Sequence, residues 1–507
     1  MSYKNVNLIF FQDVIYNGTE IKLSESEIDR IEDSYNFLIE FAKNKIIYGI
    51  NTGFGPMAQY KINSKDQTAL QYNLIRSHAS GCGQPISTED IKAAMICRLR
   101  NFTRGYSGIH PSVPKLIQSF INLGICPVLY EHGGVGASGD LVQLSHLALS
   151  LIGEGEVFYK GEIHPTSKIL KQHNLEPIKI YLREGLSLIN GTSVMTGIGI
   201  INLIKAKNLF NWSVISSTML NEIVGSYDDS FAKVLNEVKS HTGQNFVASK
   251  MRELLSGSKL IKDRNKYLYR DVKEKVFNGK VQEFYSLRCV PQILGPIYDT
   301  ITNVELTVIN EANSVNDNPI IDFENKNVYH GGNFHGDYIS LDMDKLKIAI
   351  TRLSMLEERH LNFLLNPKLN DKFPPFVNLG TLGLNLGMQG AQFTATSTTA
   401  ENQTYSFPNY VHSITNNNDN QDIVSMGTNS ALIARKVIDN SFQVLAIQFM
   451  ALAQAIDYAK CQNEMSPFTR NIYERIRQVF PVFIEDSTKY GEIADVRDFL
   501  MNNNIEI

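Results

Sequence analysis

The residues with the clearest chemical potential form the segment His132-Gly-Gly-Val-Gly-Ala-Ser-Gly-Asp140, which directly precedes an apolar stretch. One interpretation is a glycine-rich turn in which Ser138 or Asp140 caps the next helix, since Ser and Asp are favoured at that position. A phosphate-binding loop fits less well, because neither the spacing nor a lysine matches such a loop. A third interpretation is covalent chemistry within the backbone, because small residues let the chain fold onto itself.

In this third interpretation, the tripeptide Ala137-Ser138-Gly139 cyclises without help from another molecule. The main-chain nitrogen of Gly139 attacks the carbonyl carbon of Ala137 and water is lost. Ser138 then loses a second water and becomes a methylidene, which is an electrophile. The N-terminus of the following helix would stabilise negative charge that develops at the new ring.

The elements that position this loop are predicted to be helical. Ser87-Thr88-Glu89-Asp90 is typical of a helix N-terminus, and that helix should extend to about Arg104. A second helix is expected over 140–152, with Gly153 as its stop. Apolar residues recur with a period of 3.6 in four longer segments, at 196–225, 289–314, 338–366 and 428–460. Polar runs at 240–280 and 412–422 predict loops.

The chain length and the long helical segments together predict the fold class. A chain of 507 residues is too long for one ordinary core, so two or more domains are expected. We expect a mainly α protein with a smaller N-terminal domain over residues 1–195, which carries the Ala-Ser-Gly loop. Residues 196–507 are expected to form a central bundle of long helices.

The composition excludes several classes of partner. A net charge of -4 leaves no basic surface for nucleic acid. The five cysteines lie far apart without a paired motif, which indicates reduced thiols in a cytoplasmic protein and no zinc site. The N-terminus lacks the features of a signal peptide. The longest uncharged apolar stretch, Phe442 to Ile456, is too short to span a bilayer and is predicted to be a buried helix.

The segment Gly134-Val-Gly-Ala-Ser-Gly-Asp-Leu141 resembles the signature of the histidine, phenylalanine and tyrosine ammonia-lyases. In that family, the Ala-Ser-Gly tripeptide forms a 4-methylidene-imidazol-5-one. Further blocks resemble the family in the same order over about residues 45 to 430: Tyr48-Gly-Ile-Asn-Thr-Gly-Phe-Gly55, Ile189-Asn-Gly-Thr192, Tyr285-Ser-Leu-Arg288, Asn316-Asp-Asn-Pro319, His330-Gly-Gly-Asn-Phe334 and Asn420-Gln-Asp422. The resemblance implies a homotetramer whose active sites draw residues from three subunits, with a small amino-acid substrate and no metal, nucleotide or pyridoxal phosphate.

The resemblance also implies roles for single residues. Tyr48 is the expected base for the β-proton, and a free tyrosine has a pKa near ~10, so it needs a depressed pKa or a partner such as Tyr285. Arg288 is expected to bind the substrate carboxylate through its planar guanidinium. Without the resemblance, packing or turn structure would be the favoured explanation of Tyr48 and an ion pair that of Arg288, and amide side chains often only satisfy loop backbone. Residues matched to neighbours of the ring or substrate are Asn190, Gln282, Asn318, Phe334, Asn417 and Asn420.

Two positions bear on the substrate and point in different directions. Ser77-His78 resembles the pair of histidine ammonia-lyases. Asn420-Gln421-Asp422 instead resembles the tyrosine and phenylalanine enzymes, and a neutral Gln421 cannot supply the charge that a buried imidazolium needs. His78 can hydrogen-bond a phenol as readily as an imidazole. The favoured reaction is therefore elimination of ammonia from L-tyrosine to give p-coumarate, with histidine as runner-up.

Two further alternatives remain. A tyrosine aminomutase would use the same prosthetic group but would return the amine to the β-carbon. A catalytically inactive helical scaffold would need neither the intact Ala137-Ser138-Gly139 tripeptide nor Tyr48, so the presence of both argues against it.

Overall fold

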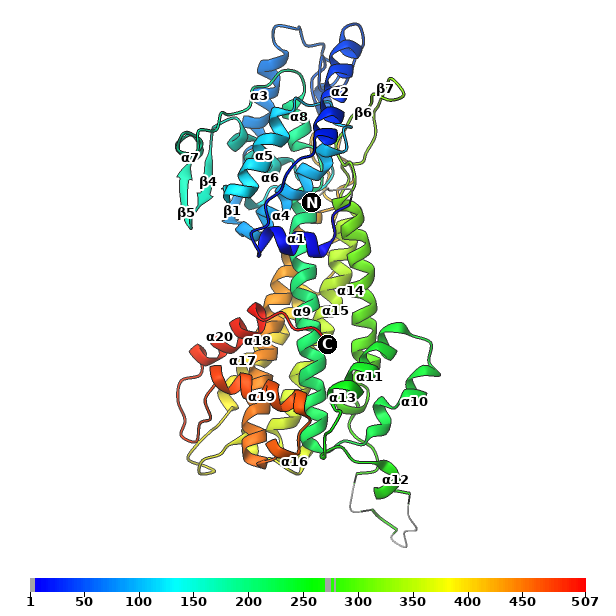
Figure 1. Cartoon of the computed structure of the whole chain (residues 1–507), viewed down its shortest axis with the longest axis vertical. Coiled ribbons are helices and arrows are strands. Elements are labelled where there is room, and N and C mark those ends of the chain that lie inside the picture. Colours follow the sequence, from blue (N-terminus) through cyan, green and yellow to red (C-terminus); the bar gives the residue numbers. More distant parts are fainter. Residues whose placement is uncertain (1–4, 270–274, 278–279) are drawn as a thin grey trace. The chain divides into compact units, whose positions relative to one another are not determined.

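The structure, a computed structural model, describes residues 5–269, 275–277 and 280–507. Helices predominate, as Figure 1 shows, which confirms the predicted mainly α class. The four predicted long segments are all helices: α9 (Ser193–Val224), α14 (Val290–Ala312), α15 (Asp337–Leu365) and α18 (Gly427–Ala459).

The chain folds into two compact units, and each is assembled from separate stretches. Unit 1 comprises Met1–Ile204, Val304–Asp344 and Pro408–Ala434, and unit 2 comprises Lys205–Asn303, Lys345–Phe407 and Arg435–Ile507. The Ala-Ser-Gly loop belongs to unit 1. All four long helices contribute residues to both units. The predicted domains, 1–195 and 196–507, divide the chain at a single position, whereas each unit combines three separate stretches. The two domains remain a prediction.

Unit 1 surrounds the loop with short helices. In α4, the Ser87 side chain accepts a hydrogen bond from the N–H of Asp90, which confirms the predicted start of this helix. The predicted helix after the loop is α6, and Gly153 beyond its end has a φ of +86°. The helices are α1 (Leu8–Ile15), α2 (Glu25–Ala42), η1 (Gly55–Met57), α3 (Gln67–His78), α4 (Thr88–Thr103), α5 (Ser112–Leu123), α6 (Leu141–Leu151), α7 (Thr166–Gln172) and α8 (Glu184–Ile189).

Short antiparallel strands complete the described part of unit 1. One pair joins β1 and β3, a second sheet has the order β2-β4-β5, and a third joins β6 and β7. The strands are β1 (Cys82–Pro85), β2 (Cys126–Pro127), β3 (Tyr130–His132), β4 (Glu156–Tyr159), β5 (Glu162–Pro165), β6 (Ile320–Asp322) and β7 (Asn327–Tyr329).

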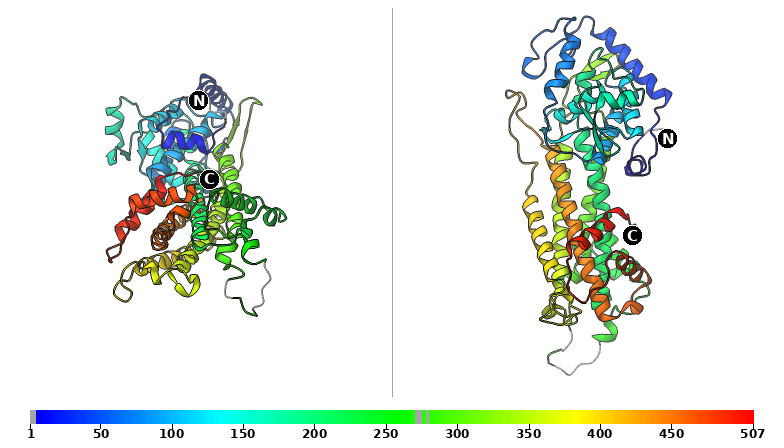
Figure 2. Two further views of the ribbon diagram at one scale, coloured as in Figure 1. Left: turned by 60° about the horizontal axis from the view of Figure 1, so that its bottom comes forward. Right: turned by 90° about the vertical axis from the view of Figure 1, so that its left-hand side faces the viewer.

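Unit 2 is helical in its described part. Figure 1 labels the portions of α9, α14, α15 and α18 within it, and Figure 2 shows α9 and α18 side by side from a second direction. Shorter helices flank them: η2 (Asp228–Phe231), α10 (Lys233–Glu237), α11 (Thr242–Leu254), α12 (Arg264–Tyr267), α13 (Tyr285–Arg288), α16 (Pro367–Asn370), η3 (Pro375–Val377), α17 (Gln389–Tyr405), η4 (Gln462–Glu464), α19 (Pro467–Val479) and α20 (Tyr490–Asn502).

The predicted loop at 240–280 is wrong over α11 and α12. Although α11 is rich in polar residues, Val247, Met251 and Leu254 recur at helical spacing and are buried, so one apolar face is enough to hold it against the unit. Residues 270–274, 278 and 279 of this predicted loop lie outside the described residues. The predicted loop at 412–422 is confirmed, since it contains neither helix nor strand.

Helix α18 is long and apolar enough to cross a membrane by length and composition alone. However, 78% of its most apolar window is buried within the protein. The stretch from Phe442 to Ile456 is thus part of a longer helix, and its prediction as a buried helix is confirmed. Burial of this kind is what the core helix of a folded unit requires.

Candidate active site

A cavity of about 820 Å³ in unit 1 contains most of the residues that the sequence singled out. They come from the segment before η1, α3, the Ala-Ser-Gly loop, the end of α8 and the loops around residues 318–334 and 417–421. The predicted residues that line it are Tyr48, Ser77, His78, Ser138, Asn190, Asn318, Phe334, Asn417, Asn420 and Gln421. Segments far apart in the chain therefore meet around Ser138.

The tripeptide is tightly enclosed on one side by the Asn190-Gly191 segment. Gly139 has a φ of +71°, and a Cβ at this position would lie 1.9 Å from the carbonyl oxygen of Gly191. The N–H of Asp140 donates to that same oxygen over 2.8 Å. Only glycine can occupy position 139 here, because its conformation and its neighbour both exclude a side chain.

Two amides contact Ser138 directly. The Nδ2 of Asn190 donates to the Ser138 carbonyl oxygen over 3.1 Å, and the Nε2 of Gln421 donates to the Ser138 Oγ over 2.8 Å. The hydroxyl that dehydration removes is thus held by Gln421. From the sequence, we expected Gln421 only beside the substrate ring, and no signal in the sequence indicated this second contact.

Asp140 joins the loop to the first turn of α9. It occupies the N-cap position of α6, but no side chain caps that helix, which removes the alternative interpretation of Ser138 or Asp140 as a helix cap. Its carboxylate instead accepts hydrogen bonds from the N–H groups of Val194 and Met195 over 2.8 and 2.9 Å, in the first turn of α9, and from Thr428 Oγ1. Complete burial raises the pKa of Asp140 to about 6, against the opposing effect of these donors.

Tyr48 lies at the cavity wall with its hydroxyl already engaged. The N–H of Gly55 donates to Tyr48 Oη over 3.0 Å, and the ring packs edge-on against Phe54. Burial raises the pKa of Tyr48, and the Gly55 hydrogen bond lowers it to a smaller extent. Unit 1 therefore does not depress the pKa of Tyr48, as a base would require. The prediction that Tyr48 needs a partner such as Tyr285 still stands.

His330 was missed as a lining residue, although it opens a sequence block that resembles the family. It lines the cavity, and its Nε2 accepts a hydrogen bond from the N–H of Tyr48 over 3.3 Å. Burial lowers the pKa of His330, which keeps the ring neutral and able to accept. The start of that sequence block could have identified it.

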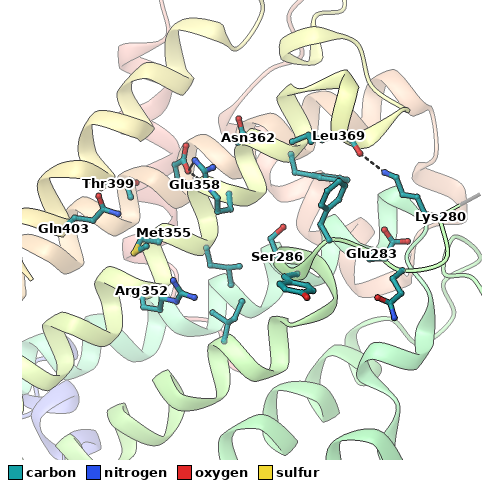
Figure 3. Close-up of a pocket in the computed structure, with 17 residues that line it drawn as sticks. Lys280, Glu283, Ser286, Arg352, Met355, Glu358, Asn362, Leu369, Thr399 and Gln403 are labelled. Atoms are coloured by element: carbon teal, nitrogen blue, oxygen red, sulfur yellow. Dashed lines mark hydrogen bonds and ion pairs between the residues drawn. The ribbon is translucent and has the colours of Figure 1, made fainter.

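Three predicted residues lie in unit 2. Gln282 and Tyr285 line a cavity of about 960 Å³ there, shown in Figure 3, together with residues of α15 and α17. Gln282 and Arg288 line a smaller cavity of about 380 Å³. The Arg288 guanidinium lies 4.6 Å from the centre of the Tyr285 ring. Among the described residues, none of these three lines the cavity around Ser138.

The surroundings of the tripeptide fit the proposed cyclised group. The cradle beside Gly139 admits no Cβ, and the Oδ1 of Asn190 is buried without a hydrogen-bond partner. Within the described ranges, no group of three or more His, Cys, Asp or Glu residues is placed to hold a metal ion. The site offers hydrogen-bond donors and acceptors around one reactive backbone segment.

This chain belongs to the aromatic amino acid lyase family, which it matches over residues 8–478. Enzymes of this family depend on a 4-methylidene-imidazol-5-one formed autocatalytically from an Ala-Ser-Gly segment, here Ala137-Ser138-Gly139.

Relatives of three activities are similar to the chain. It is 38% identical to a tyrosine ammonia-lyase of Cupriavidus metallidurans, covering 87% of this chain and 84% of the relative. It is also 38% identical to a histidine ammonia-lyase of a Geobacillus species, covering 93% and 90%. The crystal structure of a tyrosine aminomutase from Streptomyces globisporus superposes with a TM-score of 0.93 at 34% identity, covering 98% of this chain and 95% of that one.

Proposed function

We propose that this enzyme eliminates ammonia from L-tyrosine to give p-coumarate. The observation that carries the proposal is the lining of the unit 1 cavity, which combines Ser138 and Tyr48 with His78 but, among the described residues, includes no carboxylate. A buried imidazolium would need a carboxylate nearby, whereas a phenol needs only a hydrogen-bond partner. This lining supports tyrosine over histidine.

When formed, the prosthetic group supplies an electrophilic carbon for the substrate amine. The chain's own residues then hold and deprotonate the substrate. His78 accepts a hydrogen bond from the phenol, which places the ring at the end of α3. Tyr48 takes the β-proton, and its engaged hydroxyl keeps it at a fixed position beside the cavity.

The proposed site is completed by other copies of the chain. Tyr285 is 70% exposed and lies in unit 2 with Gln282 and Arg288, so its ring is available to a neighbouring molecule. In a homotetramer, these residues would reach the cavity of another copy, where Arg288 would bind the substrate carboxylate. Tyr285 would then assist Tyr48, which lacks a depressed pKa of its own.

A side-by-side assay of the purified protein with tyrosine, histidine and phenylalanine tests the substrate. We expect the kcat/KM for L-tyrosine to exceed that for L-histidine by about tenfold or more, equivalent to about 1.4 kcal/mol in the transition state. A preference for histidine would overturn the assignment. Size measurement in solution tests the homotetramer, and a monomer active at all dilutions would overturn it.

Tyrosine aminomutase is the second candidate, because the superposed crystal structure is that of such an enzyme. The two reactions differ in whether the released amine returns to the β-carbon. Chromatography of the same tyrosine reaction distinguishes them. p-Coumarate as the main product supports the lyase, and β-tyrosine as the main product would replace it with the aminomutase.

A further inference from the structure

Arg98 is a fully buried cation that no motif of the sequence singled out. It lies within α4 and has no exposed surface, and its side chain packs over the Phe102 ring at 4.7 Å. A buried guanidinium is stabilised only where hydrogen-bond acceptors or negative charge surround it. The acceptors around Arg98 therefore indicate what it holds in place.

The acceptors of Arg98 lie on the segment that encloses the tripeptide. Its Nη2 donates to the carbonyl oxygen of Asn190 over 2.8 Å, and its Nη1 donates to Asn316 Oδ1 over 3.2 Å. Asn316 is itself fixed, because its N–H donates to Asn101 Oδ1 over 2.8 Å. The planar guanidinium thus joins two loops that are distant in the sequence.

Gly191 makes this arrangement possible. A Cβ on Gly191 would lie 2.4 Å from Arg98 Nη1 and 2.5 Å from Asn316 Oδ1, so only glycine lets the guanidinium come this close. Other atoms of the same segment contact the tripeptide, namely the Gly191 carbonyl oxygen beside Gly139 and the Asn190 amide on Ser138. Asn190-Gly191 therefore joins Arg98 to the tripeptide.

We infer that Arg98 is a positioning residue for formation of the prosthetic group, because it fixes Asn190-Gly191 behind the backbone that must cyclise. The inference rests on the cyclisation of Ala137-Ser138-Gly139. In that reaction, the Gly139 nitrogen bonds to the Ala137 carbonyl carbon, and the oxygen leaves as water with the hydrogens of the Gly139 and Ser138 nitrogens. A C=N bond forms between Ala137 and Ser138. Ser138 then loses its hydroxyl and its Cα hydrogen as a second water.

Asp317 and Asp140 supply the negative charge near Arg98. Burial lowers the pKa of Arg98 to about 10, while Asp317 and Asp140 oppose that change. The guanidinium remains charged at neutral pH, so its hydrogen bonds to Asn190 and Asn316 are charge-assisted. Lysine would keep the charge but could not present two donors in one plane.

The matched control is Arg183, which is also fully buried in unit 1. Its guanidinium lies 3.7 Å from Asp317 and donates to the carbonyl oxygens of Ser107 and Asn318, but no hydrogen bond joins it to Asn190 or Gly191. Replacement of either arginine removes a buried cation beside the same aspartate. Only replacement of Arg98 removes the contact with the segment behind the tripeptide.

The experiment compares Arg98→Lys and Arg98→Met with Arg183→Lys and Arg183→Met by intact mass of the folded protein. We expect the ratio of chains lighter by two waters to unreacted chains to fall about tenfold or more in Arg98→Met. Arg98→Lys should show a smaller fall, and the Arg183 variants should cyclise as the wild type does even where their melting temperatures drop.

Each outcome decides the inference. Full cyclisation in folded Arg98→Met, or an equal loss in Arg98 and Arg183 variants of equal melting temperature, would overturn it. If Arg98→Met does not fold, the Arg98→Lys and Arg183→Lys pair decides by the same comparison. A wild type that retains both waters would instead refute cyclisation itself, which separates that failure from a failure of the role of Arg98.

Discussion

The Nδ1 atom of His78 lies 3.0 Å from the main-chain carbonyl oxygen of Leu74. A carbonyl oxygen only accepts hydrogen bonds, so Nδ1 carries a hydrogen and donates it to Leu74. The Ser77 hydroxyl lies at the same distance from Nδ1 and reinforces this orientation. With the hydrogen on Nδ1, Nε2 is the acceptor of this tautomer, and a substrate that donates from its ring is complementary to it.

Replacement of His78 by leucine should shift the preference from tyrosine towards phenylalanine. The phenol would lose its acceptor, and a buried polar group without a partner costs about 1–3 kcal/mol. The ratio of kcat/KM values for the two substrates measures this shift. Ser77→Ala should change the ratio less, because Leu74 still holds Nδ1. An unchanged ratio in His78→Leu would show that the substrate ring lies elsewhere.

Gln421→Glu should narrow the preference for tyrosine over histidine. The new carboxylate adds a partner for an imidazolium and places an anion near a phenyl ring. It also cannot donate to Ser138 Oγ, so the cyclised fraction must be measured by intact mass and used to correct the rates. A preference that stays at the wild-type value after this correction would contradict a role for Gln421 in substrate choice.

Ser138→Ala should abolish nearly all activity and leave the fold intact. Alanine lacks the hydroxyl that leaves as the second water, so no methylidene can form. Mass spectrometry should find the wild type lighter than its translated mass by two waters, and circular dichroism should find the same helix content in both. An active wild type of unmodified mass would refute the chemistry.

Tyr48→Phe should lower the rate by at least about 10²-fold, the low end for a positioned general base. Since burial raises the pKa of Tyr48, the fraction of the reactive phenolate grows with pH throughout the range below that pKa. The wild-type rate should therefore rise as the pH rises through the alkaline range, and the variant should lose this rise. Near-normal turnover in the variant would assign the proton transfer to another residue.

Asp140→Asn should change how stability depends on pH. The pKa of Asp140 is raised from 3.8 to about 6, so the folded state retains a proton in this interval that the unfolded state has released. The contribution of Asp140 to stability is complete below pH 3.8 and is lost as the pH rises to 6, by about 3 kcal/mol at 1.36 kcal/mol per unit. As the pH rises from 4 to 7, the melting temperature of the wild type should therefore fall relative to that of Asp140→Asn. If the melting temperatures of the wild type and the variant change in parallel over this pH range, the raised pKa of Asp140 is contradicted.

Local signals made much of the fold predictable. The cap at Ser87 and the 3.6-residue period of the long segments identified α4 and the four long helices, because capping and amphipathicity are read from neighbouring residues. The period was harder to recognise in α11, where polar residues cover the exposed face. The grouping into two units depends on contacts between distant stretches, and no linear pattern encodes it.

Contacts between distant residues also limited how much of the candidate site could be predicted. Motif blocks identified ten residues that line one cavity, because each block keeps its reactive residue beside recognisable glycines or amides. In the sequence, Arg98 cannot be distinguished from an ordinary charged residue of a helix. Its burial depends on acceptors 92 and 218 residues further along the chain. Asp140 likewise looked like a cap for its own helix, and only the fold directs it to α9.

The bond from Thr428 to Asp140 has a consequence for the life of the protein in the cell. These two residues are 288 positions apart, and Gln421, which holds the Ser138 hydroxyl, is almost as distant. A ribosome that has made the tripeptide must still add Thr428 and release it from the exit tunnel before the surroundings of Ser138 are complete. We therefore expect the modification to follow the synthesis of this last part of unit 1.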